Sequence, residues 1–190
     1  MTGSSLPTQR PTREDALRLA RRKYLTGERI DMRQLAAELG INRVTLYRWV
    51  GDGDALLVET MWALTETTLS EEWEKVRRRK GPRVAALVGG YLRAVVLQPG
   101  AQKFALENNE RVMRLMTLTQ HGYQPRFVAA IGTYLAKDIE SGRIHSPLSL
   151  DDLAYATVRI AESYYYLPTI TGQPPNPEGA ERVISALLRP

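Results

Sequence analysis

The feature that most constrains this chain is a pair of short helical segments joined by a three-residue turn that begins with glycine. Asp31 has the character of a helix N-cap, and Gly40 ends the segment that follows it. Between them, apolar residues recur at helical spacing: Met32, Leu35, Ala36 and Leu39. Asn42 can cap a second segment over 43–50. Two helices joined this closely must pack against each other, and the pattern predicts a helix-turn-helix.

The residue types inside this motif agree with that interpretation. Ala36 is small enough for the two helices to cross closely, and Gly40 can adopt the left-handed conformation that ends the first one. The apolar residues that are expected to pack on the small core of the motif are Ile41, Val44, Leu46, Trp49 and Val50.

The rest of the chain also predicts helices, and no strand-like alternation stands out. We expect a flexible tail over 1–11, because glycine, serine and proline dominate there. Thr12 caps a first helix that ends at Gly27, and a long helix covers about 54–79. Further helices are expected at 83–97, 101–118 (broken near Asn108 and Asn109), 123–141, 150–167 and 177–189. We therefore predict an all-α protein with a helix-turn-helix DNA-binding domain at 12–57 and a ligand-binding and dimerisation domain at 58–190.

Several functional classes find no support in the residues. The chain has no cysteine and only two histidines, His121 and His145, and we find no catalytic or zinc-binding motif. We therefore predict no enzyme activity, no cofactor and no metal. No apolar run approaches the roughly 20 residues that span a bilayer, and the N-terminal residues do not resemble a signal peptide. We expect a cytoplasmic protein without a membrane partner.

The polar side chains of the second motif helix are suited to double-stranded DNA. Its N-terminal end would enter the major groove first, where Arg43 can pair bidentately with guanine and Asn42 with adenine. Asn42 could instead serve only as a helix cap. The remaining candidates for phosphate or base contacts are Arg33, Thr45, Tyr47 and Arg48, although Tyr47 could be a packing residue and Arg48 a solvated charge.

These residues resemble a known family. The run from Leu39 to Asp52, followed by Asp54-Ala55-Leu56-Leu57, is similar to the helix-turn-helix signature of the TetR (tetracycline repressor-like) family. Its most specific part is the Thr45-Leu46-Tyr47 triplet. The resemblance covers about residues 12–60. The Arg-Trp-Val-Gly sequence at 48–51 is similar to the QsdR-like branch, whose members regulate the degradation of signalling lactones.

The resemblance implies an Ω-shaped homodimer. Each subunit would have a three-helix head, a long connecting helix and a helical ligand-binding body. The recognition-helix positions of the family fall on Asn42, Arg43, Val44, Thr45, Tyr47 and Arg48. Many members have a phosphate-contacting lysine where this chain has Gly53, so that contact is either missing here or supplied by Arg48 or Lys23. The charge distribution agrees: residues 1–57 carry ten Lys/Arg and seven Asp/Glu, within a chain of formal net charge +5.

The C-terminal body is rich in aromatic and methionine side chains, which suit either an ordinary core or an apolar ligand pocket. On the expected helix over 150–167, one face carries Tyr155, Arg159, Glu162 and Tyr166, which would form either a polar pocket wall or a solvated ion pair. The candidate ligand-binding residues are Trp62, Tyr91, Phe104, Asn109, Met113, Met116, Tyr123, Phe127, Tyr134, Arg159, Glu162 and Tyr166.

The last two long helices each carry an apolar stripe, which predicts a four-helix bundle between two subunits. The candidate dimer-interface residues are Leu153, Thr157, Ala161, Tyr164, Val183, Ile184 and Leu187. A twofold dimer suits a palindromic operator, with its heads about 34–36 Å apart or a multiple of that distance.

The function predicted from these features is a ligand-responsive transcriptional repressor. A small molecule, with lactones and acyl-type compounds as candidates, would change the tilt of the long helix and release the DNA. Two alternatives remain at this point: a nonspecific architectural DNA-binding protein without an effector, and a small helical enzyme.

Overall fold

A computed structural model describes residues 10–189, so the tail predicted for 1–11 falls almost wholly outside the described residues. Within that range the regular structure is entirely helical, which confirms the all-α prediction. A short 3-10 turn at Thr119–His121 lies between the sixth and seventh helices. The helices are α1 (Arg13–Thr26), α2 (Met32–Glu38), α3 (Arg43–Val50), α4 (Gly53–Val76), α5 (Val84–Leu97), α6 (Pro99–Thr117), α7 (Tyr123–Glu140), α8 (Leu150–Tyr165), α9 (Leu167–Ile170) and α10 (Pro177–Leu187).

Helix N-caps visible in the sequence define where these helices begin. The Asp31 carboxylate accepts hydrogen bonds of 2.9 Å from the backbone N–H groups of Arg33 and Gln34. Thr12 and Ser149 cap α1 and α8 in the same way. Asn108 has non-helical backbone angles and kinks α6 where a break was expected. The short helix α9 was not predicted, since the expected helix over 150–167 ends at Tyr165.

The first three helices form a small head with a core of its own. Leu35 of α2 and Leu46 of α3 are fully buried against Ala16 and Ala20 of α1. Gly40 has φ 65°, the left-handed conformation that the motif turn requires. One packing prediction was wrong: Val44 is 77% exposed, because it lies on the side of α3 that faces away from α1 and α2.

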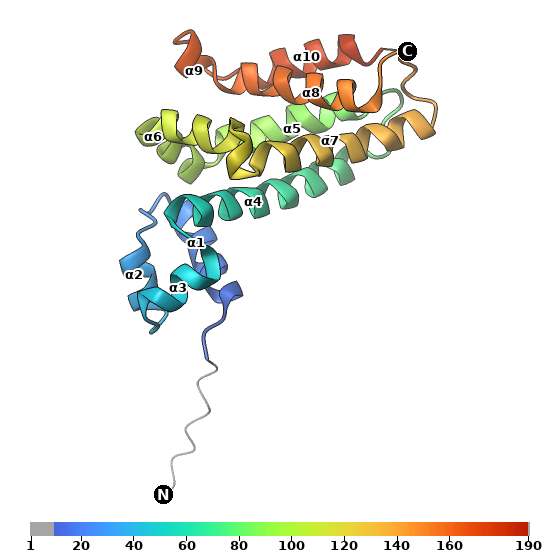
Figure 1. The fold of residues 1–190 in the computed structure, drawn as a ribbon. Helices are drawn as coiled ribbons and strands as arrows, with labels where there is room; N and C mark the ends of the chain where they lie inside the picture. The colour runs from blue at the N-terminus through green and yellow to red at the C-terminus, as the bar shows by residue number, and fades with distance from the viewer. Residues whose placement is uncertain (1–9, 190) are drawn as a thin grey trace, which may run out of the picture.

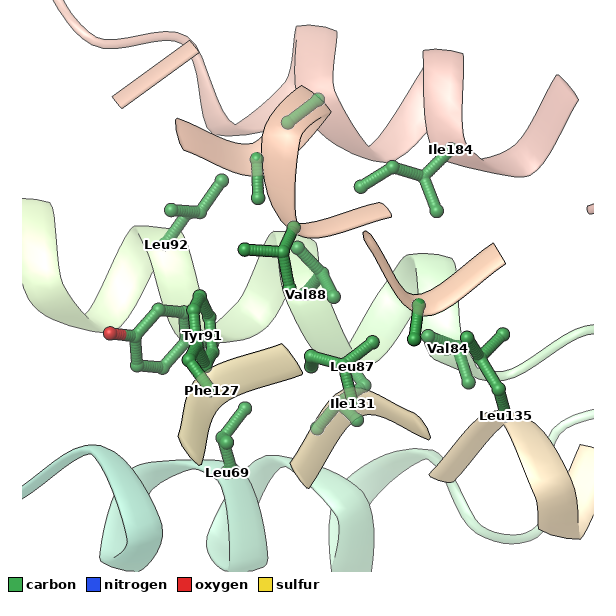
Figure 2. Close-up of a cluster of buried hydrophobic side chains, with 14 of the residues drawn as sticks. Leu69, Val84, Leu87, Val88, Tyr91, Leu92, Phe127, Ile131, Leu135 and Ile184 are labelled. Carbon is green, nitrogen blue, oxygen red and sulfur yellow. The ribbon is translucent and has the colours of Figure 1, made fainter. Parts of the chain in front are cut away.

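The body stacks the remaining helices in layers, with α4 on one side, α5 to α7 in the middle, and α8 with α10 on the other side (Figure 1). Figure 2 shows side chains from these layers meeting in one cluster, which includes Leu69 of α4, Leu87 of α5, Ile131 of α7 and Ile184 of α10. Leu87, Ile131 and Ile184 are fully buried, and each contributes about 1.5–3 kcal/mol on transfer from water. Helix α4 belongs to both regions, since it begins at the head and runs along the body.

Among residues 10–189, no single helix is long and apolar enough to cross a membrane. Only α5 and α6 taken together, across a bend of 79°, reach the required length and composition.

The head and the body meet tightly where the end of α1 approaches the start of α6. A Cβ atom added to Gly100 would lie 2.0 Å from the carbonyl oxygen of Tyr24 and 2.6 Å from that of Leu25. The Gln98 side chain also donates a hydrogen bond of 2.8 Å to the Leu25 carbonyl. Because the obstructing atoms belong to the backbone, only glycine allows this approach.

We therefore expect Gly100→Ala to push the head away from the body and to lower the free energy of unfolding by about 1–3 kcal/mol. The control is Gly132→Ala in α7, where the added Cβ would lie an ordinary 3.7 Å from Ala154. That variant should be neutral or slightly stabilising, because alanine is favoured over glycine inside a helix. Urea unfolding followed by circular dichroism measures both. Equal effects of the two substitutions would contradict the close approach of the head and the body at Gly100.

Candidate DNA-reading surface and ligand cavity

Helix α3 turns its polar side chains outward. Leu46 and Val50 face the head core, whereas Arg43, Tyr47 and Arg48 are exposed on the opposite side together with Val44. Thr45 is half-buried, and Arg33 is exposed in the first turn of α2. The candidate DNA-binding residues thus lie on the outside of the helix-turn-helix, and the cations among them are free of ion pairs within the described range.

Asn42 acts as the N-cap of α3. Its Oδ1 atom accepts a hydrogen bond of 2.7 Å from the backbone N–H of Thr45. A bidentate contact with adenine needs that oxygen as well as the amide nitrogen. As long as α3 stays capped in this way, one of the two lone pairs of Oδ1 is in use, and the Nδ2 group is the part of Asn42 that is wholly available to a base or a phosphate.

Lys23 is held inside the head and does not supply the contact with a DNA phosphate that is missing because Gly53 replaces a lysine. Its Nζ atom lies 2.7 Å from the Glu38 carboxylate and 3.3 Å from that of Glu28. The bond to Glu38 raises the pKa of Lys23 above its ordinary value despite the burial of the amine. Lys23 therefore ties α1 to α2, and exposed Arg48 remains the candidate for a phosphate contact near Gly53.

Three adjoining cavities lie in the part of the body nearest the head, and all three are lined by Val95 and Tyr165. Their volumes are about 90, 300 and 20 Å³. The largest lies between α5, α6 and the segment around α9. The candidate ligand-binding residues that line one or more of them are Tyr91, Asn109, Met116, Tyr123, Phe127, Glu162 and Tyr166.

The other candidates lie outside these three cavities. Trp62 packs edge-on against Tyr123 under the Arg126 guanidinium, and Phe104 packs on Tyr24 beside an open cleft between the head and α6. Tyr134 packs on Trp73. Met113 is half-buried on α6, and Arg159 is an exposed residue that pairs with Glu162.

Sequence reasoning missed several lining residues. Val95 and Tyr165 belong to all three cavities, and Tyr24 and Leu25 of the head line the 90 Å³ cavity. Helical periodicity marks these residues as apolar and inward-facing, but it does not show which of them border empty space.

A closed cluster of hydroxyl groups borders the 90 Å³ cavity. The Tyr123 hydroxyl lies 2.6 Å from the Thr65 hydroxyl, and the Tyr91 hydroxyl lies 3.2 Å from both. Burial raises the pKa of Tyr123 well above its ordinary value, so these groups stay neutral. Because these hydroxyl groups form hydrogen bonds with one another, a ligand in this cavity does not have to supply hydrogen bonds to them.

Glu162, in contrast, has one oxygen that is satisfied and one that is not. Its Oε2 atom accepts hydrogen bonds from Arg159 at 2.5 Å and from Gln124 at 3.2 Å. Its Oε1 atom and the Tyr166 hydroxyl are buried without a partner among residues 10–189. Burial raises the pKa of Glu162 from 4.5 to about 7, although the Arg159 charge opposes the shift.

This raised pKa makes a pH-dependent contribution to stability. Between pH 4.5 and 7 the folded chain binds more protons at Glu162 than the unfolded chain, so this contribution to the free energy of unfolding decreases as the pH rises. After allowance for partial solvent screening, we expect the loss to be about 2–3 kcal/mol.

We therefore expect the free energy of unfolding of Glu162→Gln, taken relative to that of the wild type, to rise by about 2 kcal/mol between pH 5 and pH 8. Urea unfolding of both proteins at the two pH values gives this difference and cancels the contributions of the other carboxylates. The exposed Glu140→Gln provides the control, with no comparable pH dependence. A pH-independent difference between Glu162→Gln and wild type would contradict the raised pKa.

Most of the residues predicted to form the dimer interface are buried inside the single chain. Among the seven candidates, these are at most 1% exposed within the single chain: Leu153, Thr157, Ala161 and Ile184. They cannot reach a partner, because α8 and α10 use their most apolar faces to pack on α5 and α7. Tyr164, Val183 and Leu187 retain exposed surface, and Val183 is 40% exposed.

A family model and one solved structure agree with this architecture. Residues 81–189 match the family described as "Tetracyclin repressor-like, C-terminal domain". The structure of the R. erythropolis transcriptional repressor QsdR, from the TetR family, superposes with a TM-score of 0.83 at 28% sequence identity and covers 94% of this chain and 96% of that one. The TetR family regulator PfmR from Thermus thermophilus superposes with a TM-score of 0.43 at 17% identity, covering 93% of each chain. The comparison with curated proteins gave no match.

Proposed function

Because the chain belongs to the TetR family of transcription regulators, we propose that it is a repressor that binds a palindromic operator as a homodimer and is released by a small molecule. Regulators of this family bind DNA and effectors and are not enzymes, in agreement with the prediction from sequence. The proposal includes a cytoplasmic location and the domain division at residues 57 and 58.

The observation that carries this proposal is the contact between the head and the ligand cavity. Tyr24 and Leu25, at the end of α1, line the 90 Å³ cavity together with body residues such as Tyr91 and Met116. A molecule in this cavity would touch the head directly. A ligand shifts a conformational equilibrium only through different affinities for the two states, and a cavity wall shared by both regions supplies such a difference.

Helix α6 offers a second connection between the cavity and the head. Ala101 and Val112 of α6 line the 300 Å³ cavity. On the same helix, the Arg111 guanidinium lies 2.6 Å from the carboxylate of Asp54, in the first turn of α4, and Arg114 lies 3.4 Å from it. A partly exposed pair of this kind contributes little stability. It nevertheless links any displacement of α6 to the helix that follows the helix-turn-helix.

The proposed dimer uses the outer faces of α8 and α10, which form the outermost layer of the body (Figure 1). Val183 and Leu187 of α10 and Ile160 of α8 all keep part of their apolar surface exposed. Two such helix pairs related by a twofold axis would form a four-helix bundle and cover that surface.

Selection from a pool of randomised duplexes tests the proposal even though the operator sequence is not known. We expect the purified chain to enrich an inverted repeat whose half-site centres lie one helical turn apart, about 34–36 Å, or a multiple of that distance. Enrichment of a single, unrepeated half-site would contradict the dimer. Binding with no enrichment would favour a nonspecific architectural protein.

A further inference from the structure

The 20 Å³ cavity differs from its neighbours in the chemistry of its wall. It is lined by apolar side chains such as Leu92 and Phe127, by Glu162, and by the tyrosines Tyr91, Tyr165 and Tyr166. Glu162 is only 5% exposed and Tyr166 only 7%, and the Glu162 Oε1 atom and the Tyr166 hydroxyl both lack a hydrogen-bond partner among residues 10–189. Leaving such groups unpaired in a buried site is costly, so two of them in one small cavity call for a ligand group or a water molecule.

We propose that the ligand has a long apolar body and a neutral head group that pairs a hydrogen-bond donor with an acceptor, as in a secondary amide. The donor binds Glu162 Oε1, and the acceptor binds the Tyr166 hydroxyl. This inference rests on the proposed function, because it places the ligand in the 20 Å³ and 300 Å³ cavities that adjoin the 90 Å³ cavity at the head.

The existing hydrogen bonds determine which atom must donate. Arg159 and Gln124 both donate to Glu162 Oε2, so the remaining oxygen of the ionised carboxylate can only accept. The buried Tyr166 hydroxyl, which has no partner among residues 10–189, can donate to a carbonyl. While Glu162 is ionised, a fatty carboxylate would meet its charge, and a simple ester or lactone would leave Oε1 without a donor. A cationic head is less suitable, because Arg159 already neutralises the carboxylate.

The sizes of the cavities agree with this division of roles. The 20 Å³ cavity has room for a few polar atoms, or for the single water molecule that would bridge the two groups without a ligand. The adjoining 300 Å³ cavity, which is also lined by Tyr165 and Tyr166, has mostly apolar walls, with Gln102, Asn109 and Thr169 as their other polar residues, and takes the body of the ligand.

A matched pair of probes tests the donor requirement. N-methyldecanamide has one N–H and one carbonyl, whereas N,N-dimethyldecanamide lacks the N–H and is otherwise nearly the same. We expect calorimetry at pH 8, where Glu162 is mostly ionised, to give about tenfold to hundredfold tighter binding of the N-methyl amide. Equal binding of the two probes, as expected if a water molecule stays between Glu162 and the ligand, would overturn the inference.

Glu162→Gln provides a sharper test, because it should abolish the preference for the N-methyl amide. Arg159 and Gln124 require an acceptor at the Oε2 position, so the glutamine oxygen must lie there and its amide nitrogen must replace Oε1. The unpaired acceptor then becomes a donor. We expect this variant to lose the preference for the N-methyl amide, while Glu140→Gln, an exposed carboxylate on α7, keeps it.

Tyr166→Phe tests the other half of the site. Removing the hydroxyl should weaken binding of both amides by about tenfold, because each presents the same carbonyl. Tyr155→Phe, on an exposed side of α8, should leave both affinities unchanged. Unchanged affinities in Tyr166→Phe would overturn the assignment of the acceptor.

These results separate the inference from the proposed function. If both amides bind equally and still reduce operator affinity, the head-group assignment is wrong but the chain is ligand-responsive. If neither amide binds, the inference is wrong, and the DNA selection above decides the proposed function independently.

Discussion

Replacing Asp138 with alanine should lower the free energy of unfolding by about 3–5 kcal/mol, the effect expected when one partner of a buried ion pair is removed. Asp138 is fully buried, and its carboxylate accepts hydrogen bonds of 2.6 Å from the backbone N–H and from the Nε of Arg83. It also accepts one of 3.2 Å from the backbone N–H of Val84. The substitution would leave the buried Arg83 guanidinium without its carboxylate and the first turn of α5 without its acceptor.

Chemical unfolding at pH 7 measures this effect, with Asp151→Ala as the matched control. Asp151 is exposed in the first turn of α8, so its loss should cost only about 0.5 kcal/mol. A loss below about 1 kcal/mol for Asp138→Ala would show that the contact between the start of α5 and the end of α7 does not stabilise the body as described.

Replacing Arg43 with alanine should give the largest functional loss. Arg43 is exposed at the N-terminal end of α3, where a bidentate contact with guanine is worth about 1–3 kcal/mol. A dimer that uses both heads loses this contact twice, so operator affinity should fall by about a hundredfold to ten-thousandfold.

Fluorescence anisotropy with the selected operator measures that loss, and Arg78→Ala is its control. Arg78 is exposed just beyond the far end of α4, so its removal changes the net charge equally without altering the head. It should change the affinity by less than about threefold, since only long-range charge is lost. Similar losses in the two variants would show that Arg43 contributes charge rather than recognition.

Local features of this fold were predictable from the sequence because they depend on neighbouring residues. The caps at Asp31 and Asn42, the turn at Gly40 and the kink at Asn108 each follow from a few adjacent side chains. The exposure of Val44 did not follow, because an apolar residue in a recognition helix has the same pattern whether it packs inside or faces outward.

The contacts between distant elements were less predictable. Leu153 and Ile184 form apolar stripes, but periodicity does not reveal whether a stripe meets the chain's own core or a second subunit. The cavity walls pose a similar problem, because empty space depends on how α1, α5, α6 and α8 fit together. The spacing of Glu162 and Tyr166 predicted a shared helical face, whereas the unpaired state of their polar atoms emerged only from the three-dimensional packing.

The central claim is that the exposed face of α3 recognises a specific DNA sequence. The most direct test is the ratio of affinities for the selected inverted repeat and for a scrambled duplex of equal length, measured by fluorescence anisotropy at about 0.15 M salt. We predict a ratio of about a thousandfold or more, as for other specific DNA-binding proteins at physiological salt. A ratio near one would contradict the claim and leave only nonspecific attraction between a basic chain and the phosphate backbone.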